Sequence, residues 1–264
     1  MSIDSRYYRE NDRFIQEFVD SENRLAIDES WGVARIVWKY KGKQLQNRYH
    51  FDTSNKLHKN RYTGSAIIEW DYNGDCTQET HYDEDFKLIN NRANNAAIIK
   101  WIIRDNFYEK KFYDINFELT KDYQTQVAII RHEQKHDKII FSYFDENKKL
   151  CRNKCCQAAR IESDIIEKDG FVYKEDVYYN KKLEPLYIKK SKYKSRIDED
   201  DLLLEESYHD CNMNLLNTKI TVSDKVDCKV AIIRYQYDDH YEDPISIYYN
   251  SKLQKINPTI NSNL

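Results

Sequence analysis

The chain has 264 residues, 33% of them charged and 40% apolar, which is enough for one large domain or two small ones. Its formal charge of −3 comes from 42 basic and 45 acidic residues without a long basic block, so we expect no nucleic-acid partner. No apolar stretch is long enough to span a bilayer, so we expect no membrane partner either. Glycine and proline number only 5 and 3, which excludes collagen-like chains, whereas 22 tyrosines favour strands.

The N-terminus lacks the basic, apolar and small-residue order of a signal peptide. This indicates a cytoplasmic protein, or one exported by a route that needs no signal peptide. The six cysteines are then expected to be free thiols rather than disulfides. Cys151, Cys155 and Cys156 form a loose cluster without a second pair elsewhere, so we expect neither a zinc site there nor any other cofactor.

Residues 1–30 are expected to form a helical cap. Phe14, Ile15, Phe18 and Val19 fall on one helical stripe. A helix there would cover the exposed edge of the repeat that follows it.

Residues 31–257 are organised by an internal repeat, whose first landmark is a short segment that contains alanine. The segments are VARIVWKY, SAIIEWDY, AAIIKWII, VAIIRHEQ, AARIESDI and VAIIRYQY, with Ala34, Ala66, Ala97, Ala128, Ala159 and Ala231 aligned. The first four spacings are 32, 31, 31 and 31 residues, and the last gap is 72, with Ser195 in the missing alanine place. Side chains alternate between apolar and polar in these segments, which predicts strands with one buried face.

Each alanine segment is followed by an aromatic doublet and then by Asp or Asn. With His counted as a planar member, the triplets HFD, HYD, FYD, YFD, YYN, YHD and YYN end at residues 52, 83, 114, 145, 180, 210 and 250. A leucine follows after three or five residues, namely Leu57, Leu88, Leu119, Leu150, Leu183, Leu215 and Leu253. The Asp or Asn predicts a turn, because its side chain can bond the backbone two residues further on.

Each repeat is therefore predicted to be a β-hairpin with a short third segment. The fold class is an all-β array of seven stacked hairpin units of about 31–36 residues. An open, solenoid-like array is favoured over a closed propeller, because 31 residues are few for a four-stranded blade. Residues 258–264 should form a polar tail.

The pattern resembles bacterial tandem tyrosine-rich hairpin repeats, broadly of the YD and MORN types. The resemblance rests on Ala66, the DYNG turn at 71–74 and the segment 82–88, and it covers about residues 31–257. The chain differs in having lost nearly all turn glycines. The resemblance implies a β-rich interaction surface and no shared chemistry. A weaker similarity to choline- and glucan-binding cell-wall repeats implies secretion and abundant Trp and Gly, which this chain lacks.

Residues 132–136 spell H-E-x-x-H, the motif of zinc metalloproteases. That chemistry needs His132 and His136 on one face of a helix, with Glu133 acting on the bound water. The repeat instead places His132 late in a strand and His136 in the next turn, roughly 13 Å apart along an extended chain. We therefore interpret the match as coincidental and expect no catalytic residue and no metal.

Strand alternation should place one aromatic of each doublet in the core and the other on the surface. The surface members form a predicted binding stripe, which consists of Tyr82, Tyr113, Phe144, Tyr179 and Tyr249.

The last repeat is as apolar as the internal ones, although a terminal unit normally turns polar on its free side. Ile245, Ile247 and Tyr249 are therefore expected to mediate self-association through an uncovered edge strand. The sequence thus favours a non-enzymatic protein-binding or scaffold protein whose partner is another protein or itself. A carbohydrate- or small-ligand-binding repeat protein is the alternative, and a zinc-dependent hydrolase is a more remote one.

Overall fold

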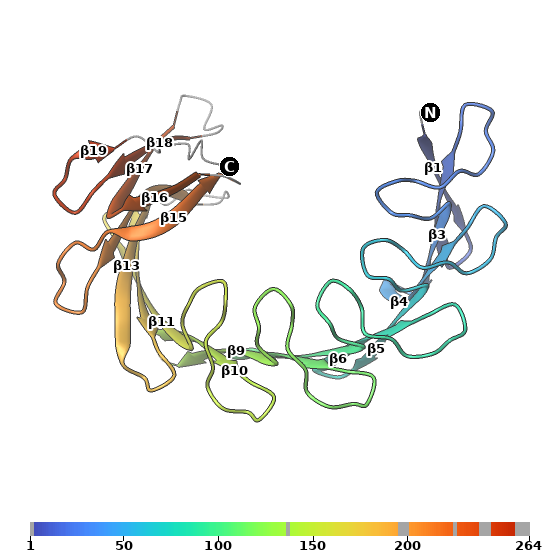
Figure 1. Cartoon of the computed structure of the whole chain (residues 1–264), viewed down its shortest axis with the longest axis horizontal. Coiled ribbons are helices and arrows are strands. Elements are labelled where there is room, and N and C mark those ends of the chain that lie inside the picture. Colours follow the sequence, from blue (N-terminus) through green and yellow to red (C-terminus); the bar gives the residue numbers. More distant parts are fainter. Residues whose placement is uncertain (1–2, 136–137, 195–200, 224–225, 238–243, 257–264) are drawn as a thin grey trace. The chain divides into compact units, whose positions relative to one another are not determined.

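The computed structural model describes residues 3–135, 138–194, 201–223, 226–237 and 244–256 (Figure 1). The described residues form β-strands and no helix, which confirms the all-β prediction. No described segment is therefore a helix long and apolar enough to cross a membrane. The strands are β1 (Asp4–Glu10), β2 (Arg13–Val19), β3 (Arg35–Lys41), β4 (Gln44–Phe51), β5 (Ile67–Asn73), β6 (Cys76–Tyr82), β7 (Ile98–Arg104), β8 (Phe107–Tyr113), β9 (Ile129–Lys135), β10 (Lys138–Phe144), β11 (Arg160–Lys168), β12 (Phe171–Tyr179), β13 (Pro185–Lys194), β14 (Leu202–His209), β15 (Thr218–Ser223), β16 (Val226–Val230), β17 (Ile232–Gln236), β18 (Ile245–Tyr249) and β19 (Lys255–Ile256).

Strand pairing proceeds from one hairpin to the next along the chain. Seventeen strands belong to one antiparallel sheet, and β14 pairs with β17 because β15 and β16 form a separate two-stranded sheet. Pairing between successive hairpins, as of β2 with β3 and of β6 with β7, joins the repeats edge to edge. This pattern is that of an open array of hairpins, as the repeat length predicts.

The chain divides into two compact units. Unit 1 comprises Met1–His132 and Tyr143–Gln157, and unit 2 comprises Glu133–Ser142 and Ala158–Leu264. Strands β9 and β10 contribute residues to both units. The predicted polar tail, 258–264, lies outside the described residues.

The N-terminal segment is a hairpin, so the predicted helical cap is wrong. Strands β1 and β2 pair from Asp4↔Val19 to Glu10↔Arg13, and β2 then pairs with β3. In the extended strand, Ile15 and Phe18 are both buried but point to opposite faces of the sheet. The apolar residues that fit one stripe of a helix are therefore buried on both faces of a strand, because each face is partly covered.

The N-terminal hairpin is in fact a further copy of the repeat. The segment FVDSENRL (18–25) matches YFDENKKL (143–150), and Val19 forms an isolated bridge with Leu25 as Phe144 does with Leu150. The expected boundary between 1–30 and 31–257 is therefore absent from the structure, and the array already begins with β1.

One turn, here called the D-turn, follows the second strand of each repeat. For Asp83, the backbone N–H donates to the Lys87 carbonyl at 2.9 Å, and the N–H of Phe86 donates to the Asp83 carbonyl at 3.3 Å. The Asp83 Oδ1 accepts from the backbone N–H groups of Asp85 and Lys87, each at 2.9 Å. The same Oδ1 bonds recur in the turns that start at Asp20, Asp52, Asp83, Asp114, Asp145, Asn180, Asp210 and Asn250. The turn predicted for Asp or Asn is thus confirmed.

The leucine landmark is equivalent in most repeats but not in all. Leucines five residues after the Asp bridge back to the strand, as Leu88 does to Tyr82. Leu183 and Leu253 instead occupy the fourth position of their D-turns, with φ of 63° and 61°, and they are exposed. Treating these two as the same landmark was wrong, because an offset of two residues moves the side chain from the bridge to the tip of the turn.

A second loop precedes each alanine in unit 1 and was not recognised in the sequence. It begins with an Asn or Asp six residues before the alanine, which is buried in every copy except the half-buried Asp28. The backbone N–H of this residue donates across the loop, as that of Asn60 does to the Ser65 carbonyl. The Asn60 side chain donates to the Ser65 carbonyl and to the Thr63 hydroxyl, both at 2.7 Å, and accepts from the Thr63 N–H at 2.8 Å. The fully described set is Asp28, Asn60, Asn91, Asp122 and Asn153. These loops also bond one another, since the Arg92 N–H donates to the Thr63 carbonyl at 2.8 Å.

The pre-alanine loops cover only part of the sheet in unit 1. They lie over face A, defined as the face that carries the first aromatic of each doublet, where the Ser65 hydroxyl bonds His81 Nδ1 at 2.9 Å. Face B carries the second aromatic. Away from the loops, both faces keep half-buried and exposed side chains, so cross-strand pairs must stabilise much of the sheet.

Replacement of Ala128 by leucine should destabilise the chain by about 1–3 kcal/mol, because the larger side chain would overpack the interior. Ala128 is fully buried, as predicted, and its backbone bonds both Phe144 and Phe112. Urea denaturation followed by tryptophan fluorescence measures the loss. Gln134→Leu, at the exposed end of β9, is the control and should change stability little. Equal stability of Ala128→Leu and the wild type would contradict this packing.

Unit 2 departs from the regular repeat. Strand β13 ends at Lys194, so the first strand of this repeat comes before Ser195, which lies outside the described residues. Tyr178 and Tyr187 stack at 4.2 Å between ring centroids, and Tyr208 forms a buried cluster with residues that include Ile233.

Candidate binding surface

The H-E-x-x-H segment lies on a strand where the structure describes it. His132 and Glu133 are neighbours in β9 and therefore point to opposite faces, while His136 lies outside the described residues. Among the described residues, no group of three His, Cys, Asp or Glu side chains is placed to hold a metal ion. Cys76, Cys151, Cys155, Cys156 and Cys211 form no disulfide, and burial raises the pKa of Cys151 to about 11.

The predicted aromatic stripe lies on face B, where its members contact charged neighbours. The Tyr82 hydroxyl donates to Glu69 at 3.1 Å, and the Lys100 Nζ lies 5.5 Å from the centroid of the Tyr113 ring. Equivalent cation contacts place Arg131 at 5.0 Å from Phe144 and Arg234 at 5.2 Å from Tyr249. Tyr179, like the other four, is half-buried.

These contacts are the cross-strand pairs expected of a sheet face. Doublets of unit 1 pair a buried and a half-buried ring, as His81 and Tyr82 do, whereas both rings of the Tyr178–Tyr179 and Tyr248–Tyr249 doublets are half-buried. Binding by the stripe stays a prediction.

Face A of unit 1 carries a row that the sequence analysis missed. Aromatic residues on the first strands alternate with charged residues on the second strands. The row is Trp38, Arg48, Trp70, Glu79, Trp101 and Lys110. In the sequence, this row is marked by a charged residue two positions before the first aromatic residue of a doublet, as Glu79 stands before His81.

The charged members of this row lie against the indole rings. The Arg48 guanidinium carbon is 6.0 Å from the centroid of Trp31 and 5.8 Å from that of Trp70. Trp70 Nε1 donates to Glu79 at 3.0 Å, and Lys110 Nζ lies 5.5 Å from the Trp101 centroid.

Burial of this row changes the acidity of its charged groups. It lowers the pKa of Arg48 and of Lys110, since loss of water disfavours their charged forms. Burial alone would raise the pKa of Glu79, but bonds from His81 and Trp70 and the charge of Arg48 hold that pKa below its usual range. The charged and aromatic side chains of this row therefore partner one another, and these contacts stabilise face A.

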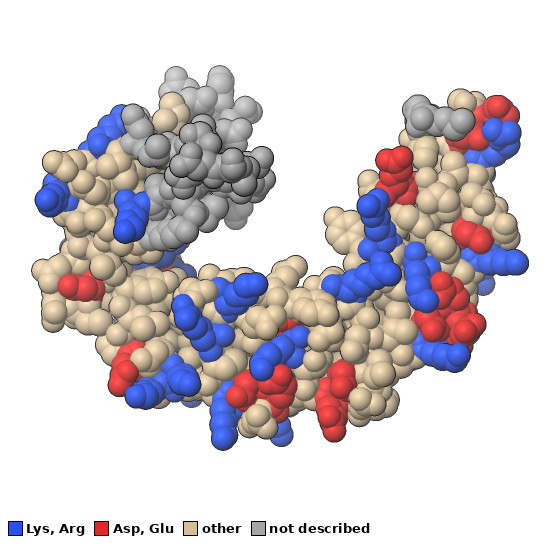
Figure 2. Space-filling view, viewed as in Figure 1, with Lys and Arg blue, Asp and Glu red and all other residues tan. Residues whose placement is uncertain are grey.

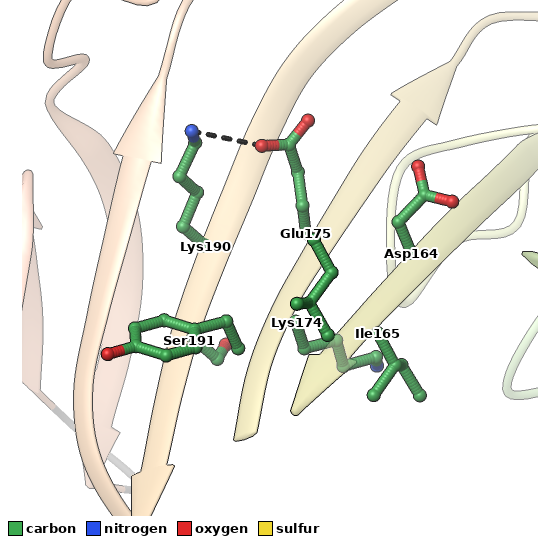
Figure 3. A pocket seen from close by; sticks show the side chains of 8 residues that line it. Asp164, Ile165, Lys174, Glu175, Lys190 and Ser191 are labelled. Atoms are coloured by element: carbon green, nitrogen blue, oxygen red, sulfur yellow. Dashed lines mark ion pairs between the residues drawn. The ribbon is translucent and has the colours of Figure 1, made fainter. Parts of the chain in front are cut away.

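Unit 2 contains a pocket of about 530 Å³ beside β11, β12 and β13. Its lining includes Asp164, Ile165, Lys174 and Ser191 (Figure 3). The Lys190 ammonium is 2.9 Å from the Glu175 carboxylate, so these two charges neutralise each other across adjacent strands. Ile165 and Ile166 also line this pocket, and both are exposed. No nucleophile paired with a base is present among the lining residues, so this hollow does not suggest a reaction.

Several D-turns carry an exposed apolar residue at their tip. The tip, defined as the fourth residue of the turn, has a φ between 60° and 66° in every described copy, which is the left-handed region. The tips are Asn23, Asn55, Phe86, Phe117, Lys148, Leu183, Met213 and Leu253. Phe86 and Phe117 are 67% and 70% exposed.

A bulky residue in this conformation costs roughly 1–2 kcal/mol relative to a right-handed backbone, whereas glycine tolerates it. Exposure of an aromatic ring to water adds a second disadvantage at the same position. Such local strain is typical of functional positions. The sequence signal is the scarcity of turn glycines, with phenylalanine at position 86 and position 117 where glycine would tolerate the backbone best.

Charge is distributed without one dominant sign. Basic and acidic side chains are interspersed over the described surface visible in Figure 2. Ion pairs join adjacent D-turn regions, with Lys59 bound to Glu84 at 2.9 Å and Lys121 to Glu146 at 3.0 Å.

No protein-family model, no curated protein and no solved structure matches this chain.

Proposed function

We propose that the chain is a non-enzymatic repeat protein that binds other proteins through side chains presented along its open sheet. One observation carries this proposal. The D-turn keeps a single backbone conformation in every described copy, whereas the side chains at its second to fourth positions differ from copy to copy. A rigid scaffold that presents variable exposed side chains suits recognition, since little ordering entropy is lost on binding.

Carbohydrate binding is the second candidate, and the tryptophan row of face A is what favours it. Sugar rings would have to stack on free indole faces. Arg48 lies against Trp31 and Trp70, and Lys110 lies against Trp101, so these faces already have partners. A zinc-dependent hydrolase is supported least, because His132 and Glu133 lie on a strand.

Selection from a random peptide library displayed on phage tests the proposal. The full chain should enrich short peptides that bind it when resynthesised, because the exposed turn tips offer anchoring contacts. A glycan array probed with the same protein is the second arm. Enrichment of no peptide, together with retention on defined glycans, would replace protein binding by carbohydrate binding.

Self-association through the C-terminal hairpin forms part of the proposal. In β18, Ile245 to Ile247 pair with β17, while β19 pairs only with Tyr248 and Tyr249. The other edge of that segment therefore has no pairing among the described residues, and Ile245 is 69% exposed. At the opposite end of the array, β1 carries charged residues, such as Arg6 and Arg9, that discourage edge pairing.

Ile247→Lys should therefore weaken self-association, because a charge opposes pairing of an apolar edge. Light scattering across a concentration series measures the molar mass of each protein, and the wild type is expected to form oligomers. Arg9→Lys, on β1, keeps the charge and should leave the oligomer unchanged. A wild type that stays monomeric at high concentration would contradict the proposal.

A further inference from the structure

We propose that Phe86 and Phe117 together form a docking site for a protein segment in which apolar residues are flanked by lysine or arginine. The inference rests on the proposed function and names the partner's chemistry. Both residues belong to unit 1 and are the tips of D-turns in adjacent repeats.

The two rings occupy equivalent places on one rigid backbone. Their turns follow β6 and β8, which are separated by β7, so the strands that carry the turns are about 10 Å apart at the usual strand spacing. In each turn, the Oδ1 of the first Asp accepts the same two hydrogen bonds from backbone N–H groups. Ile115, in the second turn, is also exposed and adds apolar surface beside Phe117. Two aromatic anchors at a fixed separation suit a segment that extends over two adjacent repeats.

The charges of these two turns indicate the partner. Residues 83–88 contain three acidic residues and one basic, a net charge of −2, and residues 114–119 contain two acidic residues and no basic one, also −2. The turns whose tips are Asn55 and Lys148 have no net charge. Residues 52–57 contain one acidic and one basic residue, and residues 145–150 contain two of each. Acidic turns therefore coincide with phenylalanine tips, and a basic partner is the complement.

The acidic residues of these two turns also argue against a lipid surface or a second copy of the chain as the partner of Phe86 and Phe117. Anionic lipid headgroups would be repelled by Asp85 and Glu118, which are both exposed. A second copy of this surface would bring like charges together. A segment of another protein that is both basic and apolar meets neither of these charge repulsions.

The test uses the full chain and the displayed peptide library. Peptides selected on the wild type are resynthesised with a fluorescent label and titrated by anisotropy against Phe86→Gly/Phe117→Gly. Because glycine accepts the left-handed backbone, this variant should unfold at a urea concentration no lower than the wild type does. Loss of binding in it then cannot come from unfolding. Asn55→Gly/Lys148→Gly is the matched control, since it makes the same backbone change at tips that carry no aromatic ring.

The enriched peptides should combine apolar residues with lysine or arginine. Their affinity should fall at least about tenfold in the phenylalanine variant and stay within about twofold in the control. Peptides that are acidic, or that bind the phenylalanine variant as tightly as the wild type, would overturn this docking site while leaving protein binding intact. Failure to enrich any peptide would remove the proposed function itself. Sedimentation of the wild type, but not of the phenylalanine variant, with phosphatidylcholine and phosphatidylserine vesicles would assign the rings to a lipid surface and overturn the proposal.

Discussion

Asn60→Ala is expected to lower the free energy of unfolding by about 3 kcal/mol, because three buried hydrogen bonds of the side chain are lost together. The Asn60 amide donates to the Ser65 carbonyl and the Thr63 hydroxyl, and its oxygen accepts from the Thr63 N–H. Water cannot replace these partners readily, since Asn60 is only 1% exposed. Chemical denaturation of the full chain, followed by tryptophan fluorescence, measures the loss.

Asn60→Asp is the informative comparison, because aspartate occupies the same place at residue 122. There the Asp122 carboxylate accepts from the Thr125 N–H at 2.8 Å and from its hydroxyl at 2.6 Å. Asn60→Asp keeps an acceptor for Thr63 but loses the donor to Ser65, so its stability should fall between those of the wild type and Asn60→Ala. A loss below about 0.5 kcal/mol for the alanine variant would show that the pre-alanine loop does not support the array.

Acid should destabilise the chain well above the pH at which carboxylates titrate, and His50 should cause much of that effect. Burial, followed by the positive charge of Arg48, lowers the pKa of His50 from 6.5 to about 3. Between these values the unfolded chain takes up a proton that the folded chain does not. Unfolding therefore becomes more favourable as the pH falls, and the contribution of neutral His50 is complete only above pH 6.5 or so. At about 1.4 kcal/mol per pH unit, acidification from pH 6.5 to 5 should cost about 2 kcal/mol.

His50→Phe isolates this effect, because phenylalanine already occupies the equivalent place at residues 18 and 112. His50 Nδ1 lies 3.1 Å from the Ala66 carbonyl, while the buried Nε2 has no hydrogen-bond partner among the described residues. The variant should lose less stability than the wild type when urea midpoints at pH 7 and pH 5 are compared. The pKa values of Glu17 and Glu109 are held below their usual range, so these groups add to acid unfolding mainly below this window. An unchanged pH dependence in His50→Phe would assign the effect to other groups.

The repeat could be found from the sequence because its landmarks perform local tasks. Asp or Asn recurs where a side-chain oxygen must accept from two backbone N–H groups, as Asp83 does. Alanine recurs where loops leave no room for a larger side chain, as at Ala97 and Ala128. The alternation of each doublet follows from strand geometry alone.

The N-terminal error shows how local patterns can compete. The apolar spacing of Phe14 to Val19 is compatible with both a helix and a strand, whereas the segment FVDSENRL matches the other turns. Pairing of β2 with β3 decides for the strand, because it connects the hairpin to the array through backbone hydrogen bonds. The buried Asn60 and its equivalents escaped notice for a related reason, since a polar residue in a loop gives no sign that a neighbouring loop will cover it.

The sequence by itself determined the strands, the D-turns and their order, because each depends on contacts among residues close in the chain. Only the tertiary structure decided which side chains gather across strands. Arg48, Trp70 and Glu79 lie in different strands and meet through the register of the sheet. It likewise revealed Phe86 and Phe117 as an exposed, strained pair, because exposure and backbone conformation depend on how each turn is held by the folded array.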